Sequence, residues 1–185
     1  MQSNAVVYAN SVLGARTVKY PDFLDIAVVL TGRAPKGGLH LDFNRRATLV
    51  VQAPADVHGL RDVDDSFWPL LGYHVGLISS SGIPVVVGID CLSPSTDDLK
   101  AFGAALATTS SAPMFHIVGV TPEASSLDAA IATDKPITTS DVKLTDLAIC
   151  WDKLNGAEPN QAIGLISCGS LHFSLNEVKA LAKLC

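Results

Sequence analysis

The sequence predicts an α/β fold, in which helices are layered on both sides of a mainly parallel sheet in an α/β/α arrangement. Short runs of β-branched residues alternate along the chain with amphipathic helix patterns, which is typical of strand–helix–strand units. Pro, Gly or Asp residues bound these runs, as expected of strands buried on both faces. The length of 185 residues suits one domain with a substantial core, so we expect residues 1–185 to form a single α/β domain.

Four segments are predicted to be strands, because each is a short apolar run that ends in turn-forming residues. They are residues 47–51, 83–89, 114–120 and 163–167. The connections between them are long enough to hold a helix, so the strands are expected to run parallel. A ligand is then expected at their carboxyl ends.

Two helices are predicted from a hydroxyl residue that precedes a carboxylate by three positions, followed by apolar residues at helical spacing. These helices cover residues 96–108, after Ser95, and residues 174–184, which begin at Ser174. Residues 22–30 are also predicted to be helical, with Asp22 as the cap.

Residues 65–77 have a helical pattern, but it contains Pro69 and Gly72. Both residues disfavour a helix interior, so the sequence predicts an interrupted helix there.

Composition excludes several classes of protein. The net charge of −5 and the pI near 5.4 disfavour a nucleic-acid partner, which requires clustered Lys and Arg. No apolar run approaches the ~20 residues of a membrane span, and the N-terminus lacks a secretory signal, so a cytoplasmic location is expected. Charged residues make up only 17%, against a typical ~25%. We therefore expect another structure to cover one face of the domain.

The four cysteines are far apart in the sequence and include no Cys-x-x-Cys pair. They are Cys91, Cys150, Cys168 and Cys185. Disulfide bonds and a self-contained zinc site are therefore disfavoured. Free buried cysteine is the structural alternative for each of them.

Three segments combine glycine with polar residues: 10–17, 115–124 and 167–174. The guanidinium of Arg16 suits a carboxylate, and His116 lies in a strand that leads to Thr121. The last segment combines a thiol, hydroxyls, an imidazole and a helix N-terminus, which are the ingredients of an anion or metal site. Structural alternatives stay open: a core histidine at 116, a surface arginine at 16, and helix capping around Ser174.

These segments, in the same order along essentially the whole chain, resemble the large-subunit domain of aconitase X. The resembling segments are 8–17, 31–35, 97–100, 115–124 and 171–175, together with His40, Asn44 and Arg45. This family is a branch of the aconitase superfamily, so the resemblance implies an aconitase-like fold and an iron–sulfur hydro-lyase. Bacterial members dehydrate cis-3-hydroxy-L-proline, and archaeal members dehydrate mevalonate 5-phosphate.

The resemblance also implies roles for particular residues. A cluster held by three cysteine thiolates would act as a Lewis acid on the departing hydroxyl, while a base removes the α-proton. The implied substrate-binding residues are Asn10, Ser11, Gly14, Arg16 and Thr121. The implied catalytic residues are His116, His172 and Ser174. Cys168 is the implied metal ligand, with Cys91 and Cys150 as alternatives.

The sequence departs from the family in several places. Family large domains are longer, with a cysteine-containing segment before the part matched here, and a smaller swivelling domain is thought to supply the catalytic serine. Where the family has Ser-Pro-His or Cys-Pro-His, this chain has Ser170-Leu171-His172, and its thiol lies at Cys168.

We therefore expect a fragment of an iron–sulfur-dependent dehydratase that acts on a small hydroxy acid. The cis-3-hydroxy-L-proline type is favoured by the His-Phe-Ser ending. Its expected partners are the remainder of the large domain and the small swivelling domain, without which it should be inactive. The alternatives are a mevalonate 5-phosphate dehydratase, a non-catalytic α/β domain with a small-anion pocket, and a metal-free acid/base enzyme that uses His116 and His172.

Overall fold

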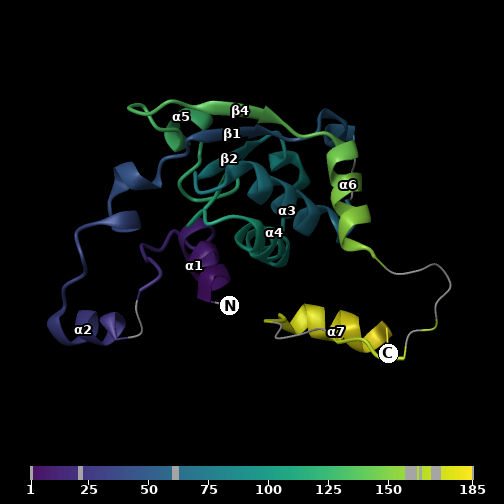
Figure 1. The fold of residues 1–185 in the computed structure, drawn as a ribbon, viewed down its shortest axis with the longest axis horizontal. Coiled ribbons are helices and arrows are strands. Elements are labelled where there is room, and N and C mark those ends of the chain that lie inside the picture. Colours follow the sequence, from purple (N-terminus) through teal and green to yellow (C-terminus); the bar gives the residue numbers. More distant parts are fainter. Residues whose placement is uncertain are drawn as a thin grey trace.

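The sheet confirms the predicted fold class. The computed structural model describes residues 2–20, 23–59, 63–156, 162, 164–167 and 172–184. Its four strands all run parallel, in the order β3-β2-β1-β4 (Figure 1). They are β1 (Leu49–Gln52), β2 (Pro84–Val87), β3 (His116–Ile117) and β4 (Thr138–Asp141).

Helices and short 3-10 turns connect the strands. The α-helices are α1 (Gln2–Ser11), α2 (Leu24–Thr31), α3 (Phe67–Ser79), α4 (Thr96–Thr109), α5 (Leu127–Ala130), α6 (Leu144–Leu154) and α7 (Leu175–Leu184). The 3-10 helices are η1 (Gly38–His40), η2 (Asp42–Arg45), η3 (Ala55–Gly59) and η4 (Asp90–Leu92).

Alternate residues of β1 and β2 enter two separate cores. Leu49 and Val51 of β1 pack with apolar residues of α1, α3, α4 and α6, which form the helical layer on one face of the sheet. Val50, between them, packs on the other face with η1 and α5. This alternation follows from the two-residue period of a strand. The second face is thus covered by short helical turns and loops, and this thinner layer leaves room for a cavity.

Helix α3 runs without interruption, so the predicted break is wrong. Pro69 is the third helical residue, where the backbone nitrogen has no partner within the helix, so its missing N–H removes no bond. Gly72 lies where α3 meets the backbone of Phe102 in α4. Its missing side chain is what permits this close approach.

Three other predicted helices are confirmed, whereas one predicted strand is shortened and another is wrong. Helix α4 begins at a complete capping box formed by Ser95 and Asp98, and α7 and α2 are also confirmed. Asp22, the predicted cap of α2, lies outside the described residues.

The strand predicted at 114–120 is shortened to β3, since the chain turns from residue 118 onward. The strand predicted at 163–167 is wrong over 164–167, which have no regular secondary structure, and Ile163 lies outside the described residues.

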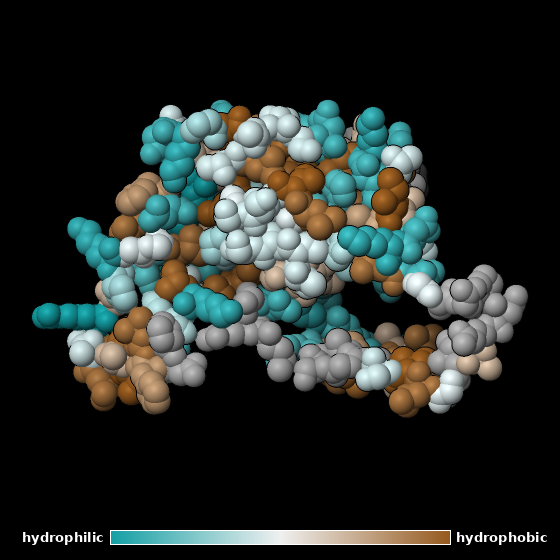
Figure 2. Space-filling view, viewed as in Figure 1, coloured by the Kyte–Doolittle hydropathy of each residue, from teal (hydrophilic) through white to brown (hydrophobic). Residues whose placement is uncertain are grey.

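Two helices expose their apolar side chains. Helix α2 has no buried residue, and Phe23, Val29 and Leu30 are about 80% exposed. Helix α7 likewise buries none of its residues and exposes Leu175 and Leu184. Brown surface marks both helices in Figure 2. Within the described part of the chain, no helix is long and apolar enough to cross a membrane.

Candidate functional site

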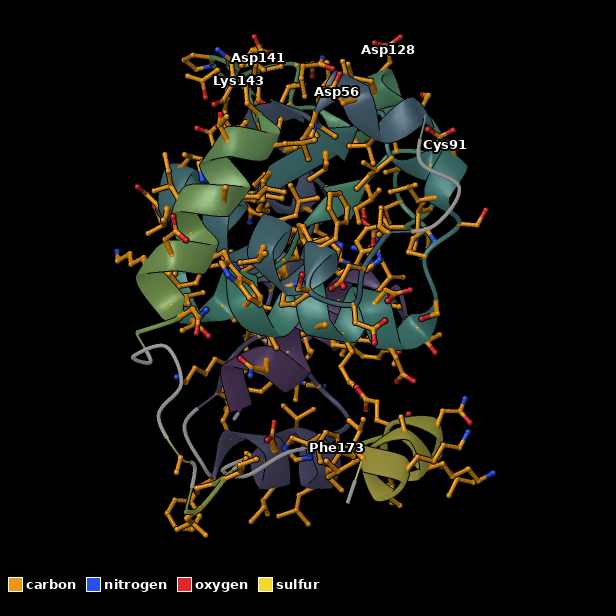
Figure 3. All side chains as sticks on the ribbon, turned by 90° about the vertical axis from the view of Figure 1, so that its right-hand side faces the viewer. Asp56, Cys91, Asp128, Asp141, Lys143 and Phe173 are labelled. Atoms are coloured by element: carbon orange, nitrogen blue, oxygen red, sulfur yellow. The ribbon has the colours of Figure 1, made fainter. Side chains whose placement is uncertain are left out.

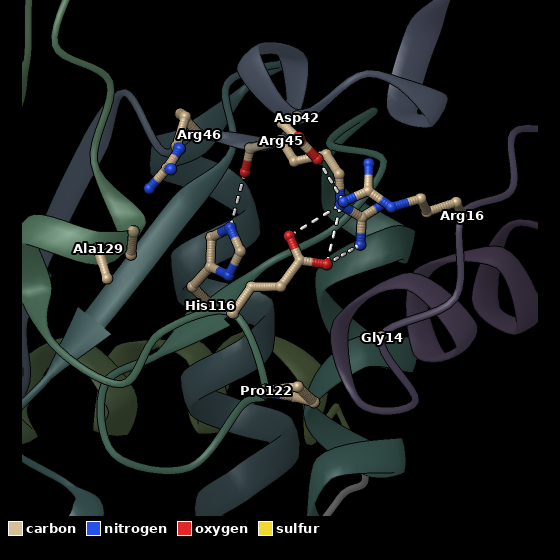
Figure 4. A pocket seen from close by; sticks show the side chains of 10 residues that line it. Gly14, Arg16, Asp42, Arg45, Arg46, His116, Pro122 and Ala129 are labelled. Carbon is tan, nitrogen blue, oxygen red and sulfur yellow. Dashed lines mark hydrogen bonds and ion pairs between the residues drawn. The ribbon is translucent and has the colours of Figure 1, made fainter.

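A cavity of about 490 Å³ opens beside the thinly covered face of the sheet (Figure 4). It is lined by Gly14, Arg16, Asp42, Arg45, Arg46, His116, Pro122, Glu123, Ala129 and Ala130. Most of these residues come from the loop after α1, from the chain before β1 and from the turns after β3. The cavity therefore lies near the carboxyl end of β3 but not at the carboxyl ends of β1, β2 and β4, so the strand–helix pattern predicted the position of a ligand only in part.

Arg45 is the buried centre of this cavity wall, with only 1% of its surface exposed. Its Nε donates to both carboxylate oxygens of Glu123, at 2.9 and 2.8 Å, and its Nη2 donates to the same carboxylate. Nη2 also donates to the carbonyl of Asn10, while Nη1 donates to the Asn10 side chain and to the Leu39 carbonyl. Since an arginine has five N–H groups, all of them are occupied within the protein. Arg45 thus organises the wall and has no donor left for a ligand.

His116 is also buried, with 1% exposed, and its tautomer follows from its single hydrogen bond. Its Nε2 lies 2.7 Å from the backbone carbonyl of Arg45. A carbonyl only accepts, so Nε2 carries the hydrogen and, in the neutral ring, Nδ1 carries a lone pair. Burial lowers the pKa of His116, which keeps the ring neutral near pH 7.

The Nδ1 atom of His116 is buried and has no hydrogen-bond partner among the described residues. An unsatisfied buried acceptor costs roughly 1–3 kcal/mol, and such atoms are rare in native structures. Nδ1 of His116 lies in the wall of the cavity, which makes His116 a candidate functional residue.

Two further arginines face the same cavity. Arg16 forms an ion pair with Asp42 and donates to the carbonyl of His40 at 3.1 Å. Its side chain is 44% exposed and that of Asp42 is 78% exposed, so this pair is weak and a ligand can replace it. The guanidinium of Arg46 makes no hydrogen bond or ion pair with the described residues. Both arginines are available to an anionic ligand.

Gly14 lets the loop after α1 close over the cavity. Its φ of +64° lies in the left-handed region that favours glycine. The position of its missing Cβ would lie 3.7 Å from Pro122, next to Glu123. The loop that carries Arg16 therefore packs against the turn that carries Glu123.

Asn10, Ser11 and Thr121, predicted to bind substrate, are buried beside the cavity and are not among its lining residues. Asn10 bonds to the backbone of Thr17 and to Arg45. Ser11 Oγ accepts from the N–H of Phe115 at 2.9 Å. Thr121 Oγ1 accepts from the N–H of Ile117 at 3.0 Å. In this structure they fix the loops, and their contact with substrate stays a prediction.

His172 and Ser174 lie at a different place, where α7 meets the start of α4. Ser174 Oγ donates to Asp97 at 2.7 Å, and Lys100 Nζ donates to the carbonyl of His172 at 3.1 Å. Lys100 also forms ion pairs with Asp97 and Glu177. Neither His172 nor Ser174 lines the cavity, so the structure brings Arg16 and His116 together but not His172 or Ser174.

The described cysteines do not form a cluster site. Cys91 is exposed on η4, while Cys150 is buried on α6 with its Sγ 3.8 Å from Nδ1 of His74. Figure 3 shows Cys91 and Phe173, which follows His172, toward opposite ends of the molecule. Cys168 and Cys185 lie outside the described residues. No group of three His, Cys, Asp or Glu residues among those described could hold a metal ion, so a three-thiolate cluster does not fit these residues on their own.

Sequence reasoning missed four charged residues of the cavity: Asp42, Arg45, Arg46 and Glu123. The Thr-Pro-Glu segment after a predicted strand was a signal for Glu123, and Arg45 lay in a resembling segment. Their pairing spans 78 residues, and no local pattern in the sequence reveals it.

Comparison with known protein families gives two adjacent matches. The model described as aconitase X first domain matches residues 1–43, and the model described as aconitase X second domain matches residues 47–152. Both matched stretches contribute lining residues of the cavity, while Arg45 and Arg46 lie between the two stretches.

Among curated proteins, the chain is similar to cis-3-hydroxy-L-proline dehydratase of Hypocrea jecorina, with 61% identity over 184 residues. It is 48% identical to the protein of the same name from Pseudomonas aeruginosa. It is 37% identical to the phosphomevalonate dehydratase large subunit of Thermococcus kodakarensis. These matches cover 99–100% of this chain but only 30%, 31% and 44% of the three relatives.

A solved structure is also similar. The holo-form of aconitase X from Thermococcus kodakaraensis superposes with a TM-score of 0.67 and 38% sequence identity. The match covers 82% of this chain and 36% of that one.

Proposed function

The chain belongs to the aconitase X family, and from that membership we propose that it is part of a dehydratase that acts on a small hydroxy acid, of the cis-3-hydroxy-L-proline type. The observation that carries this proposal is the identity of 61% and 48% to two cis-3-hydroxy-L-proline dehydratases. Identity to the four phosphomevalonate dehydratase large subunits is only 31–37%. The mevalonate 5-phosphate type is therefore the alternative substrate class.

The cavity offers groups that suit such a substrate. In our proposal, Arg16 releases Asp42 and forms a two-pronged bond to the substrate carboxylate, since a planar guanidinium matches two oxygens. Arg46 adds a second positive charge on the same wall. Gly14 lets the loop that carries Arg16 approach the substrate.

Dehydration needs a base for the proton on the carbon next to the carboxylate. We assign this role to His116, because its ring is neutral and its Nδ1 keeps a lone pair. The electrons of the broken C–H bond form the double bond, and the hydroxyl leaves from the neighbouring carbon. Nδ1 is covered in this structure, so the atoms over it must shift before it meets substrate. His172, Ser174 and Cys168 keep the roles that the resemblance implies, as predictions.

The rest of the enzyme must complete this site. The departing hydroxyl has to take up a proton or bind a Lewis acid, and the described residues lack a set of three thiolates for a cluster. Any cluster therefore draws on ligands outside the described residues. The exposed apolar faces of α2 and α7 suit packing against the remaining large domain and the small domain. We accordingly propose that this chain alone is inactive, and that it acts in the cytoplasm.

A hybrid enzyme tests the function. The matching 184 residues of the Hypocrea jecorina dehydratase are replaced by this chain, and dehydration of cis-3-hydroxy-L-proline is measured beside mevalonate 5-phosphate. We expect turnover of the first compound and none of the second. The reverse preference would establish the alternative substrate class. A folded hybrid that converts neither compound would overturn the dehydratase proposal.

The two arginines of the cavity wall, Arg16 and Arg46, favour a second candidate, a non-catalytic domain that binds a small carboxylate in this cavity. It predicts that the isolated chain binds L-proline, that chelators leave this binding unchanged, and that the hybrid is inert. Turnover by the hybrid would exclude it.

A further inference from the structure

We propose that Arg45 is a positioning residue, which fixes the Glu123 carboxylate with its guanidinium and the tautomer of His116 with its backbone carbonyl. This inference rests on the proposed function, because it assigns Arg45 a role in the same reaction. Arg45 was not among the residues predicted from the sequence, and its five satisfied N–H groups exclude direct hydrogen bonding to substrate.

The Arg45 side chain is anchored by acceptors from several parts of the chain. Asn10 binds the Arg45 guanidinium through both its side chain and its carbonyl, and Leu39 adds a third acceptor. These anchors come from α1 and η1, on either side of the loop that carries Arg16. The guanidinium therefore holds α1, η1 and Glu123 in one rigid arrangement. A lysine could not reproduce it, because an ammonium has three donors and no fixed plane.

The backbone carbonyl of Arg45 binds His116. A side chain anchored at five N–H groups restricts the backbone to which it is attached, so the Arg45 carbonyl has one position. That carbonyl accepts the hydrogen of His116 Nε2 at 2.7 Å. The other nitrogen is thereby left as the acceptor, at a buried atom with no partner among the described residues. Arg45 thus determines which nitrogen of His116 can take a proton.

Burial and nearby charges together set the pKa of His116. Burial lowers this pKa most, and the hydrogen bond from Nε2 to the Arg45 carbonyl raises it. The charge of Glu123 also raises it, whereas the charges of Arg45 and Arg46 lower it. Because Arg45 holds Glu123 in place, it also controls the position of a carboxylate that raises the pKa of His116. Moving Arg45 would change both the tautomer and the charge environment of the ring.

The test measures the ring nitrogens of His116 directly. Nitrogen-15 NMR of the full 185-residue chain distinguishes a protonated from an unprotonated Nδ1, whether or not the protein is active. We expect one neutral tautomer, with the hydrogen on Nε2, in the unmodified chain. In Arg45→Lys and Arg45→Gln we expect a mixture of tautomers. Arg33→Gln, at an exposed arginine that does not line the cavity, is the matched control and should leave the signals unchanged.

If Arg45 had only a structural role, its substitution would lower the free energy of unfolding and leave the His116 signals of the folded chain unchanged. That result would overturn the inference. If both Arg45 variants fail to fold, Glu123→Gln, which keeps the guanidinium, provides the test. We expect it to shift the titration of His116 to lower pH without changing the tautomer. An unchanged titration would equally overturn the inference.

Kinetics of the hybrid enzyme separate this inference from the proposed function. Arg45→Lys should lower kcat by at least tenfold while KM changes less than threefold, because Arg45 does not touch substrate. If the hybrid is inert but the NMR signals change as expected, the dehydratase proposal fails and the positioning of His116 stands. If the hybrid is active and Arg45→Lys leaves kcat unchanged, the positioning role fails and the dehydratase proposal stands.

Discussion

Gly72 of α3 lies directly against the backbone of Phe102 in α4. A Cβ added at Gly72 would stand 2.9 Å from the Cα and the carbonyl carbon of Phe102, and closer still to its carbonyl oxygen. Since these neighbours are backbone atoms within a helix, they cannot rotate away. The two helices of the main layer are therefore packed together through a glycine that sequence patterns treat as a helix breaker.

This contact predicts that Gly72→Ala is destabilising, although alanine favours helices. We expect a loss of about 1–3 kcal/mol in the free energy of unfolding, as is typical of overpacked cores. Urea denaturation would measure it. Gly156→Ala is the matched control, because nothing lies within 4 Å of its added Cβ. Equal stability of the two variants would contradict the close approach of α3 and α4.

The fold was predictable wherever the signal was local. Helix α4 carries its capping box in four consecutive residues, and the apolar runs of β1 and β2 stand out in the sequence. Strand β4, with the sequence Thr-Thr-Ser-Asp, has no apolar residue and forms by pairing with β1. A strand that depends on a distant partner leaves no periodic pattern of its own.

The cavity was predictable only in part, for the same reason. Arg16 and His116 were identified because their residue types and segments point to anion and proton chemistry. Arg45 and Glu123 acquire their roles from each other, across 78 residues of chain. Ser174 shows the reverse case, since its local pattern correctly predicted the start of α7, while its position against Asp97 was not visible in the sequence.

The buried His116 predicts a specific pH dependence of stability. Its pKa in the folded chain is lowered by burial below the ordinary value of 6.5, so unfolded chains bind its proton at higher pH than folded chains do. Stability should therefore be constant above about pH 7 and decline as the pH falls below about 6.5. Urea denaturation between pH 8 and pH 5 would show this decline, and His116→Gln should reduce its slope. A variant with the same slope as the unmodified chain would refute the assignment, whereas the control His74→Gln should retain it.

The contact between α4 and α7 predicts a local effect of Lys100. Its ammonium group binds Asp97, Glu177 and the carbonyl of His172. Lys100→Met should therefore release α7, raising hydrogen exchange of its amides at least tenfold. The unfolding of the sheet should change little, because α7 buries none of its residues. Lys179→Met, on α7 itself, is the control, and equal exchange in both variants would show that Lys100 does not hold the helix.

The same contact predicts a change at Asp97. Hydrogen bonds from Ser174 and then from Lys100 hold the pKa of Asp97 below its ordinary value. Ser174→Ala should raise that pKa toward 3.8, because the first of these bonds is lost. Carbon-13 NMR of the Asp97 carboxyl during an acid titration would measure the shift. An unchanged pKa would place Ser174 away from Asp97 in solution.

Arg16 provides the most direct test of ligand binding in the cavity. Its pairing with the exposed Asp42 is weak, so a carboxylate ligand should displace Asp42 and bind the guanidinium with both oxygens. Arg16→Ala should weaken binding of L-proline to the isolated chain about tenfold, which corresponds to about 1.4 kcal/mol. Asp42→Asn should strengthen binding, because the competing carboxylate is removed. Titration calorimetry would measure both variants, with the exposed Arg33→Ala as control. If Asp42→Asn weakens binding, Asp42 orients Arg16 for the ligand instead of competing with it, and the exchange of partners at Arg16 is wrong.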